Sequence, residues 1–210
     1  MPMDMIADRI MSIAPTKTRF DRHWSSMRNI EIKIRVSDKQ RMSQLLKDVG
    51  AQYISTVDQH DYYLAMGKNK EKLRVIDNRE FCLISYRRAE NAGKKDSTFE
   101  LTELTALEAD RILNSRRVIK EVRKSRQLWT YLHTGIHLDE VDGMGSFLEL
   151  ETAICDITYE EGAEEFERVA AKLSIDSAKG IPASYSDMVP ELGVSRVAEH
   201  YLVSNDVENG

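Results

Sequence analysis

The sequence predicts an α+β fold, in which a single closed or nearly closed antiparallel sheet carries helices on its outside. Three observations support this prediction. Residues 29–36 alternate strictly between apolar and polar side chains, which is the period of a β-strand. Strand-like segments recur in two groups that a helix-like segment separates. Helical segments with one apolar side are available to cover the apolar face of such a sheet.

The first half of the chain predicts a strand, a helix and an antiparallel meander. The strand is expected over residues 29–36. Ser37 or Asp38 can cap the following helix, which Gly50 ends. Four strand-like segments come next, at residues 52–58, 61–64, 72–76 and 81–87.

The second half predicts a helix, a second meander and another helix. Thr105 and Glu108 form a capping box for a helix that reaches about Ser115. Strands are expected at residues 118–133, 136–141 and 146–154, with breaks at 134–135 and 143–145. Thr158 and Glu161 form a second capping box, for a helix that extends to Leu173. The remaining residues are weakly patterned.

Length and composition predict one domain with tails. The chain has 210 residues, of which 41% are hydrophobic, and this is enough to build a core. We expect an N-terminal extension at residues 1–27, the domain at 28–190 and a C-terminal tail at 191–210. The first 27 residues lack the apolar run of a signal peptide, and no segment approaches the ~18 apolar residues of a spanning helix.

The charge balance and the cysteines narrow the choice of partners. A net charge of -5 argues against nucleic acid, because proteins that bind it usually carry a basic domain or patch. Cys82 and Cys155 are far apart and outside metal-binding spacings, so we expect neither a zinc site nor a disulfide framework. A cytoplasmic protein without a membrane partner is expected. The sequence leaves open whether the chain forms a homodimer.

The charged positions of the expected strands suggest a site for a metal-bound polyanion. Glu31, Lys33 and Arg35 share one strand face and combine a hard oxygen donor for Mg²⁺ or Mn²⁺ with cations for phosphate oxygens. Other expected strands repeat this pattern with Lys72, Arg74, Lys124, Arg126, His137, Asp139, Glu149 and Glu151. Half-buried strands also show charged faces to water, so the residues alone leave open whether these charges face inward or outward.

Several stretches match, in order, the motifs of one known family. The matches are residues 29–33 to E-x-E-x-K, 59–63 to Q-x-D-x-[YF]-[YF], 72–74 to K-L-R, 83–88 to L-I-x-Y-x-R, 93–97 to G-P-K-x-S, 137–151 to H-L-D-x-V-x-G-L-G-x-F-x-E-L-E, and 184–187 to S-Y-S-D. Over residues 28–188 the chain thus resembles the CYTH domain, or triphosphate tunnel metalloenzyme, family. That family includes class IV adenylyl cyclases and thiamine triphosphatases.

The resemblance implies an eight-stranded antiparallel β-barrel, or tunnel, with helices packed outside, which binds a triphosphate-containing small molecule with Mg²⁺ or Mn²⁺. Carried over position by position, it implies metal ligands at Glu31, Glu149 and Glu151. Catalytic roles fall to Glu31, Lys33 and Asp139. The implied phosphate-binding residues are Lys33, Arg35, Lys72, Arg74, Arg88, Lys124 and Arg126. Arg87 remains an alternative to Arg88.

One departure from the family pattern bears on function. The first Glu of E-x-E-x-K is Asn29 here, so the metal cluster has one charge fewer, although an amide oxygen can still bind a metal. The resemblance implies a metal-dependent enzyme that acts on a triphosphate, and residues 143–151 and 184–187 are most similar to the class IV cyclase branch of the family. Such a site permits hydrolysis as well as cyclisation, and we predict a triphosphate hydrolase. The alternatives are a class IV adenylyl cyclase, which makes cyclic AMP and pyrophosphate, and a binder of triphosphate or polyphosphate without catalysis.

Overall fold

The computed structural model describes residues 28–67, 69–88, 97–154, 157–176 and 179–192. The expected extension at 1–27, most of the motif at 93–97 and residues 193–210 lie outside this part of the chain. Eight strands form one antiparallel sheet: β1 (Arg28–Val36), β2 (Gln52–Ala65), β3 (Asn69–Ile76), β4 (Glu80–Arg88), β5 (Ser97–Leu104), β6 (Lys120–Tyr131), β7 (Thr134–Val141) and β8 (Gly145–Ile154).

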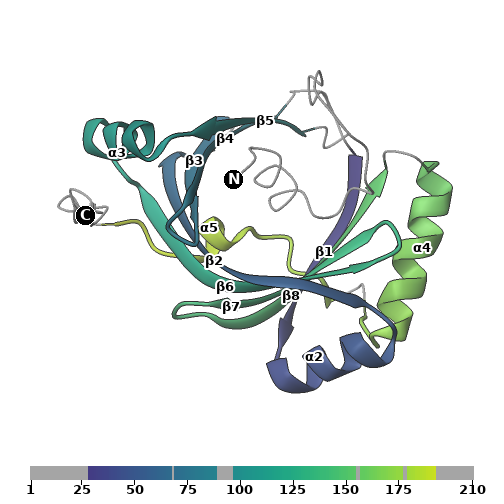
Figure 1. Cartoon of the computed structure of the whole chain (residues 1–210). Coiled ribbons are helices and arrows are strands. Elements are labelled where there is room, and N and C mark those ends of the chain that lie inside the picture. Colours follow the sequence, from purple (N-terminus) through teal and green to yellow (C-terminus); the bar gives the residue numbers. More distant parts are fainter. Residues whose placement is uncertain (1–27, 68, 89–96, 155–156, 177–178, 193–210) are drawn as a thin grey trace, which may run out of the picture.

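The sheet is strongly curled, and it confirms the predicted α+β class with eight antiparallel strands. Its order is β1-β8-β7-β6-β2-β3-β4-β5, so β1 and β5 are the two ends of the described ladder. Figure 1 shows these two ends turning toward the same side, so that the sheet encloses a concave interior. In the described residues the sheet is a curled ladder of eight antiparallel strands, which is consistent with the tunnel that the resemblance implied.

Three helices, α2, α3 and α4, begin where the sequence predicted them, whereas α5 lies in a segment for which no helix was predicted. Asp38 caps α2 by accepting a hydrogen bond of 2.9 Å from the backbone N–H of Arg41. Thr105 and Thr158 form the predicted capping boxes of α3 and α4. The bounds are α2 (Lys39–Asp48), α3 (Ala106–Ser115), α4 (Tyr159–Lys172) and the single-turn α5 (Tyr185–Met188). No helix in the described part of the chain combines the length and apolar character that a membrane crossing requires.

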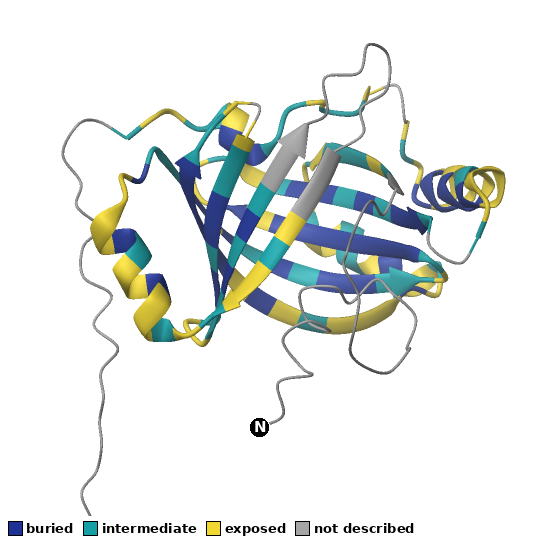
Figure 2. Ribbon diagram, turned by 90° about the horizontal axis from the view of Figure 1, so that it is seen from above, coloured by how far each residue is buried: buried dark blue, intermediate teal, exposed yellow. Residues whose placement is uncertain are grey.

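The main hydrophobic core lies on the convex side of the sheet. Figure 1 shows α2, α3 and α4 outside the curl and α5 inside it. Leu46 of α2 and Phe166 of α4 pack in one cluster with Leu148 and Leu150 of β8, while α3 covers Leu73 and its neighbours in a second cluster. Each fully buried leucine contributes about 1.5–3 kcal/mol. Figure 2 shows that the helices bury one side and expose the other.

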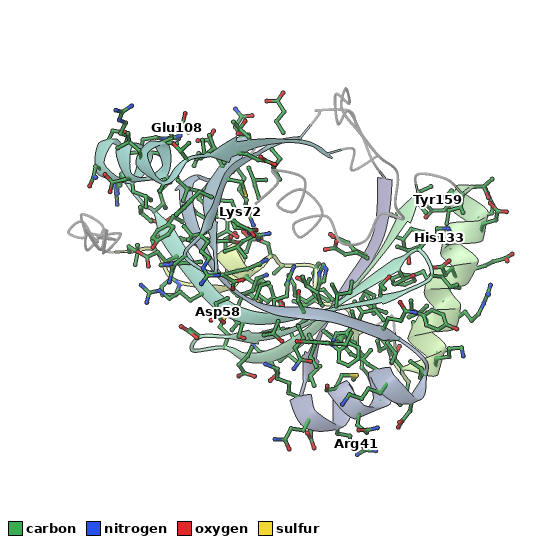
Figure 3. All side chains as sticks on the ribbon, viewed as in Figure 1. Arg41, Asp58, Lys72, Glu108, His133 and Tyr159 are labelled. Atoms are coloured by element: carbon green, nitrogen blue, oxygen red, sulfur yellow. The ribbon has the colours of Figure 1, made fainter. Side chains whose placement is uncertain are left out.

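A buried carboxylate fixes α4 to the sheet. Glu165 accepts hydrogen bonds from the backbone N–H of His133 at 2.8 Å and from the hydroxyl of Thr134 at 2.7 Å. Its second oxygen is 2.9 Å from Nδ1 of His133. His133 accordingly lies beside α4 in Figure 3, on the outside of the curl.

The structure corrects three strand predictions. The segments expected at 52–58 and 61–64 form one strand, β2, because both halves pair with β6, with one register shift between Tyr53 and Ser55. The turn before β7 is at Leu132, whose φ is 53°, and β7 already begins at Thr134, within the predicted break. Strand β5 was missed, since its alternation is short and follows directly on a polar stretch.

Candidate active site

The concave side of the sheet carries the charged side chains. Directly opposed residues of antiparallel strands point to the same face. Glu31 lies opposite Glu151, and Lys33 lies opposite Glu149. The same register continues around the interior through His137, Asp139, Arg126, Lys124, Gln59, Asp61, Arg74 and Lys72. Because the apolar clusters and the helices cover the convex side, the alternating strands turn their polar positions inward.

One ion-pair cluster joins β2 and β3. Asp61 is 3% exposed and accepts hydrogen bonds from Lys72 Nζ at 2.7 Å and from Arg74 Nε and Nη2 at 2.6 and 2.8 Å. Burial raises the pKa of Asp61, but Arg74 and Lys72 outweigh it and hold that pKa well below its usual value. Figure 3 shows Lys72 pointing into the curl. Both cations are among the predicted phosphate-binding residues, whereas Asp61 had no predicted role, although it lies in the Q-x-D motif.

A second cluster joins β6, β7 and α5. Asp139, which is fully buried, accepts from Arg126 Nε and Nη2 at 2.7 and 2.6 Å. It also accepts from Lys124 at 3.3 Å and from the hydroxyl of Tyr185 at 2.9 Å. Burial raises the pKa of Asp139, but Arg126 and Lys124 outweigh this effect and lower it to about 2. Burial and Arg126 lower the pKa of Lys124 to about 8.

Glu149 connects this second cluster to β1. Its carboxylate forms an ion pair with Arg126 and another with Lys33, whose Nζ is 3.0 Å from Oε1. Burial raises the pKa of Glu149, yet Arg126 leads the cations that bring it well below its usual value. Glu149 is therefore ionised at neutral pH and can serve as a metal ligand.

Three donors at the β7–β8 end of the interior can hold a metal ion. His137, Glu149 and Glu151 each offer one ligand atom, and these atoms lie within 4.8 Å of one another. Glu31 faces Glu151 across the β1–β8 ladder. Two carboxylates beside an imidazole suit a divalent cation, so the donor set fits the metal that the family resemblance implies. Of the predicted ligands, Glu149 and Glu151 are in this group, and Glu31 adjoins it.

The remaining predicted residues lie farther from this centre or outside the described side chains. Arg35 is exposed, and its Nη1 donates to the carbonyl oxygen of Met144 at 2.8 Å. Arg88 pairs with Ser97 through the backbone of β4, but its side chain and those of Arg87 and Asn29 are not among those described. The choice between Arg87 and Arg88 thus remains a prediction.

The segment around α5 enters the interior and contacts several cations. Lys33 Nζ is 4.0 Å from the ring centroid of Tyr185 and donates to the carbonyl oxygen of Ala183 at 3.2 Å. Lys124 Nζ is 4.9 Å from the same ring. At one side, Lys70 donates to the hydroxyls of Ser184 and Ser186, each at 2.9 Å. The S-Y-S-D match was the signal for this segment, but spacing alone gave it no place in the fold.

The interior thus defines an α+β protein with a charged, curled sheet that combines carboxylates, an imidazole and at least five lysine and arginine side chains. The sequence model of the CYTH domain matches residues 27–185. The chain therefore belongs to the CYTH family.

Known relatives agree with this assignment. A protein of Methanocaldococcus jannaschii named "Putative adenylate cyclase" is 26% identical over 176 residues, which cover 77% of this chain and 98% of that protein. A solved structure from Pyrococcus horikoshii has a TM-score of 0.64 at 21% identity and covers 77% of this chain and 99% of its own. Another, a "putative adenylate cyclase" from Vibrio parahaemolyticus, has a TM-score of 0.60 at 23% identity, with 76% and 96% covered. The two structures share the fold.

Proposed function

We propose that this protein is a divalent-metal-dependent phosphohydrolase that cleaves a triphosphate bound in the concave interior of the sheet. The convergence of cations from β1, β3 and β6 with carboxylates from β7 and β8 carries this proposal. CYTH proteins bind triphosphate substrates and in general depend on a metal. Like cations repel by roughly 1–4 kcal/mol per pair at 4 Å. Five cations share three carboxylates here, so a polyanion would supply further compensating charge.

The metal would be Mg²⁺ or Mn²⁺, and Glu31, Glu149 and Glu151 would hold it. When bound, it supplies a Lewis acid that polarises phosphoryl oxygens. Lys33 lies beside Glu149 at 3.0 Å, so it can reach a phosphate oxygen next to these carboxylates.

The cations of the two buried clusters would bind the phosphate chain. Lys72 and Arg74 come from one wall, and Lys124 and Arg126 come from another. Asp61 and Asp139 hold these side chains in place by hydrogen bonds, which lowers the entropy lost on binding. Charge that develops on the departing phosphate oxygen would be stabilised by the same cations. The attacking water gains a bond to the terminal phosphorus, the bridging P–O bond breaks, and a proton is released.

Adenylate cyclase activity is the second candidate, and the name of the Methanocaldococcus jannaschii relative favours it. In that reaction the ribose 3′-hydroxyl attacks the α-phosphorus of ATP and pyrophosphate leaves. The same cations would stabilise the departing pyrophosphate. Hydrolysis is the simpler reaction, because it needs only the phosphate-binding groups described above and water.

Product analysis separates these functions. The purified protein is incubated with inorganic triphosphate, thiamine triphosphate or ATP, each with Mg²⁺ or Mn²⁺, and products are identified by phosphorus NMR. Orthophosphate is the expected product. Formation of cyclic AMP and pyrophosphate from ATP would show that the protein is a cyclase and not a hydrolase. Tight binding without any product would show that it binds triphosphate without catalysis.

A pair of glutamate variants tests the site itself. Glu149→Gln should lower metal-dependent turnover by roughly 10²-fold or more, since it removes a charged ligand beside the phosphate-binding cations. Glu140→Gln is the matched control, because Glu140 is exposed on the same hairpin. Equal turnover in the two variants would rule out the assigned site.

A further inference from the structure

His137 occupies an unusual position in the interior. It lies on β7 opposite Glu149 of β8 and is only 5% exposed. Its Nδ1 is 3.8 Å from Oε2 of Glu149 and 3.8 Å from Oε1 of Glu151. The imidazole is therefore aimed between two carboxylates, at the same distance from each.

The Nδ1 atom is buried without a hydrogen-bond partner among the described residues. A separation of 3.8 Å is too long for a hydrogen bond, and a buried polar atom left unpaired costs about 1–3 kcal/mol. An imidazole nitrogen can bind a metal ion through its lone pair, and the two carboxylate oxygens beside it offer lone pairs as well. A cation between the three atoms would satisfy all of them.

The spacing of the three donors fits such a cation. Ligands at ~2.1 Å from an octahedral ion stand ~3.0 Å apart when adjacent and ~4.2 Å apart when opposite. The donor atoms of His137, Glu149 and Glu151 lie within 4.8 Å of one another, so side-chain movements of less than about 1 Å would bring them into range. Lys33 and Arg126 bind Glu149, and a carboxylate has further lone pairs for a metal.

An imidazole ligand changes which metal a site prefers. Oxygen ligands alone suit Mg²⁺ and Ca²⁺, whereas imidazole nitrogen suits first-row transition ions, whose affinity rises from Mn²⁺ through Co²⁺. Asn29 also disfavours Mg²⁺, because it stands where the family motif has a glutamate and so removes a hard anionic oxygen.

We propose that His137 is a ligand of the metal ion held by Glu149 and Glu151, and that its imidazole makes the site select transition-metal dications over Mg²⁺. This inference rests on the proposed metal site in the interior. It adds a ligand that the sequence motifs did not assign, and it concerns metal choice, which can be measured without turnover.

Metal titration without triphosphate tests the selectivity. Calorimetry with Co²⁺, Mn²⁺ and Mg²⁺ should show the wild-type protein binding Co²⁺ and Mn²⁺ more tightly than Mg²⁺. His137→Gln should weaken Co²⁺ binding by at least about 10-fold and change Mg²⁺ binding by less than about 3-fold. His60→Gln is the matched control, because His60 also contacts a carboxylate, Glu121 at 3.0 Å, but on the convex face. Equal losses in both variants, or no preference in the wild type, would overturn the proposal.

A spectroscopic measurement tests the ligand directly. Pulsed electron paramagnetic resonance of the Mn²⁺-loaded wild type should show coupling to a directly bound nitrogen, and selective ¹⁵N-histidine labelling should change that coupling. The coupling should persist in His60→Gln and disappear in His137→Gln. Absence of nitrogen coupling in the labelled wild type refutes the proposal even if His137→Gln fails to fold. If nitrogen coupling is present but the protein turns over no triphosphate, His137 is a metal ligand and the proposed hydrolase activity is wrong.

Discussion

Lys124 should take up a proton when a triphosphate binds. Burial and Arg126 lower its pKa to about 8, so above that pH much of the folded protein carries a neutral amine. The negative charge of a bound triphosphate favours the ammonium form and raises the pKa again. We predict uptake of up to about one proton per site near pH 9 and little uptake near pH 7. Calorimetry in buffers of different ionisation enthalpy measures the proton count.

The same residue sets a pH dependence of stability without ligand. A lysine in the unfolded chain titrates near 10.4, so between about pH 8 and that value the unfolded state binds more protons than the folded state. Stability therefore rises with pH across this window. Lys124→Met should remove both this rise and the proton uptake. Unchanged uptake in Lys124→Met would assign the proton to another group.

Asp61 should be essential for stability because it compensates two buried cations. Asp61→Asn preserves the shape but leaves Lys72 and Arg74 without their carboxylate. Removing one partner of a buried ion pair typically costs about 3–5 kcal/mol. Urea unfolding should show this loss, and inorganic triphosphate should restore part of it by supplying the missing negative charge. A loss below about 1 kcal/mol would show that water reaches this cluster.

The dependence of the unfolding free energy on pH in the acid range provides a second test of Asp61. Its pKa is lowered in the folded state, so its contribution is present above the unfolded value near 3.9 and is lost as pH falls through the folded value. In Asp61→Asn the fall in stability below about pH 4 should become shallower than in the wild type.

At the scale of elements, the segment at α5 should position the cations of the interior. The Tyr185 ring lies 4.0 Å from Lys33 Nζ and 4.9 Å from Lys124 Nζ, and its hydroxyl donates to Asp139. Tyr185→Phe loses only the hydroxyl, so stability should fall by about 1.5–3 kcal/mol with little change in KM. Tyr185→Leu also loses the ring, and cation–π contacts of up to about 2 kcal/mol predict a rise in KM of roughly 10-fold. Steady-state kinetics of the two variants, with unfolding curves, separate the effects. Equal KM values in Phe and Leu variants would contradict a positioning role for the ring.

The elements also show what the sequence could and could not predict. Caps and periodicity located α2, α3 and α4 because these signals are local. Alternation along a strand is also a local signal, so it correctly predicted that Glu149 and Glu151 share one face. The partners of Asp61 depend on the register between β2 and β3, which shifts between Tyr63 and Ala65, and no local pattern encodes that shift. The place of Tyr185 depends on the path of residues 174–184, which have little periodicity.

At the scale of the whole molecule, cations and carboxylates are paired inside the curl. The chain carries a net charge of -5, yet lysines and arginines gather in the interior, where Asp61, Asp139 and Glu149 compensate them. An anion in bulk solution meets an overall negative protein. A triphosphate that enters the interior meets oriented cations on several strands, which distant parts of the sequence contribute.

This arrangement predicts that anions stabilise the fold by specific binding and not by general screening. A ligand at 100 times its Kd stabilises the folded state by about 2.7 kcal/mol, which corresponds to about 5–10 °C in Tm for a domain of this size. Thermal unfolding with inorganic triphosphate should show that shift, and sodium chloride at equal ionic strength should not. Arg126→Gln should lose most of the shift. Arg123→Gln should retain it, because Arg123 is exposed on the opposite face of the same strand. A similar shift in both variants would place the anion outside the curl, on the exterior of the molecule.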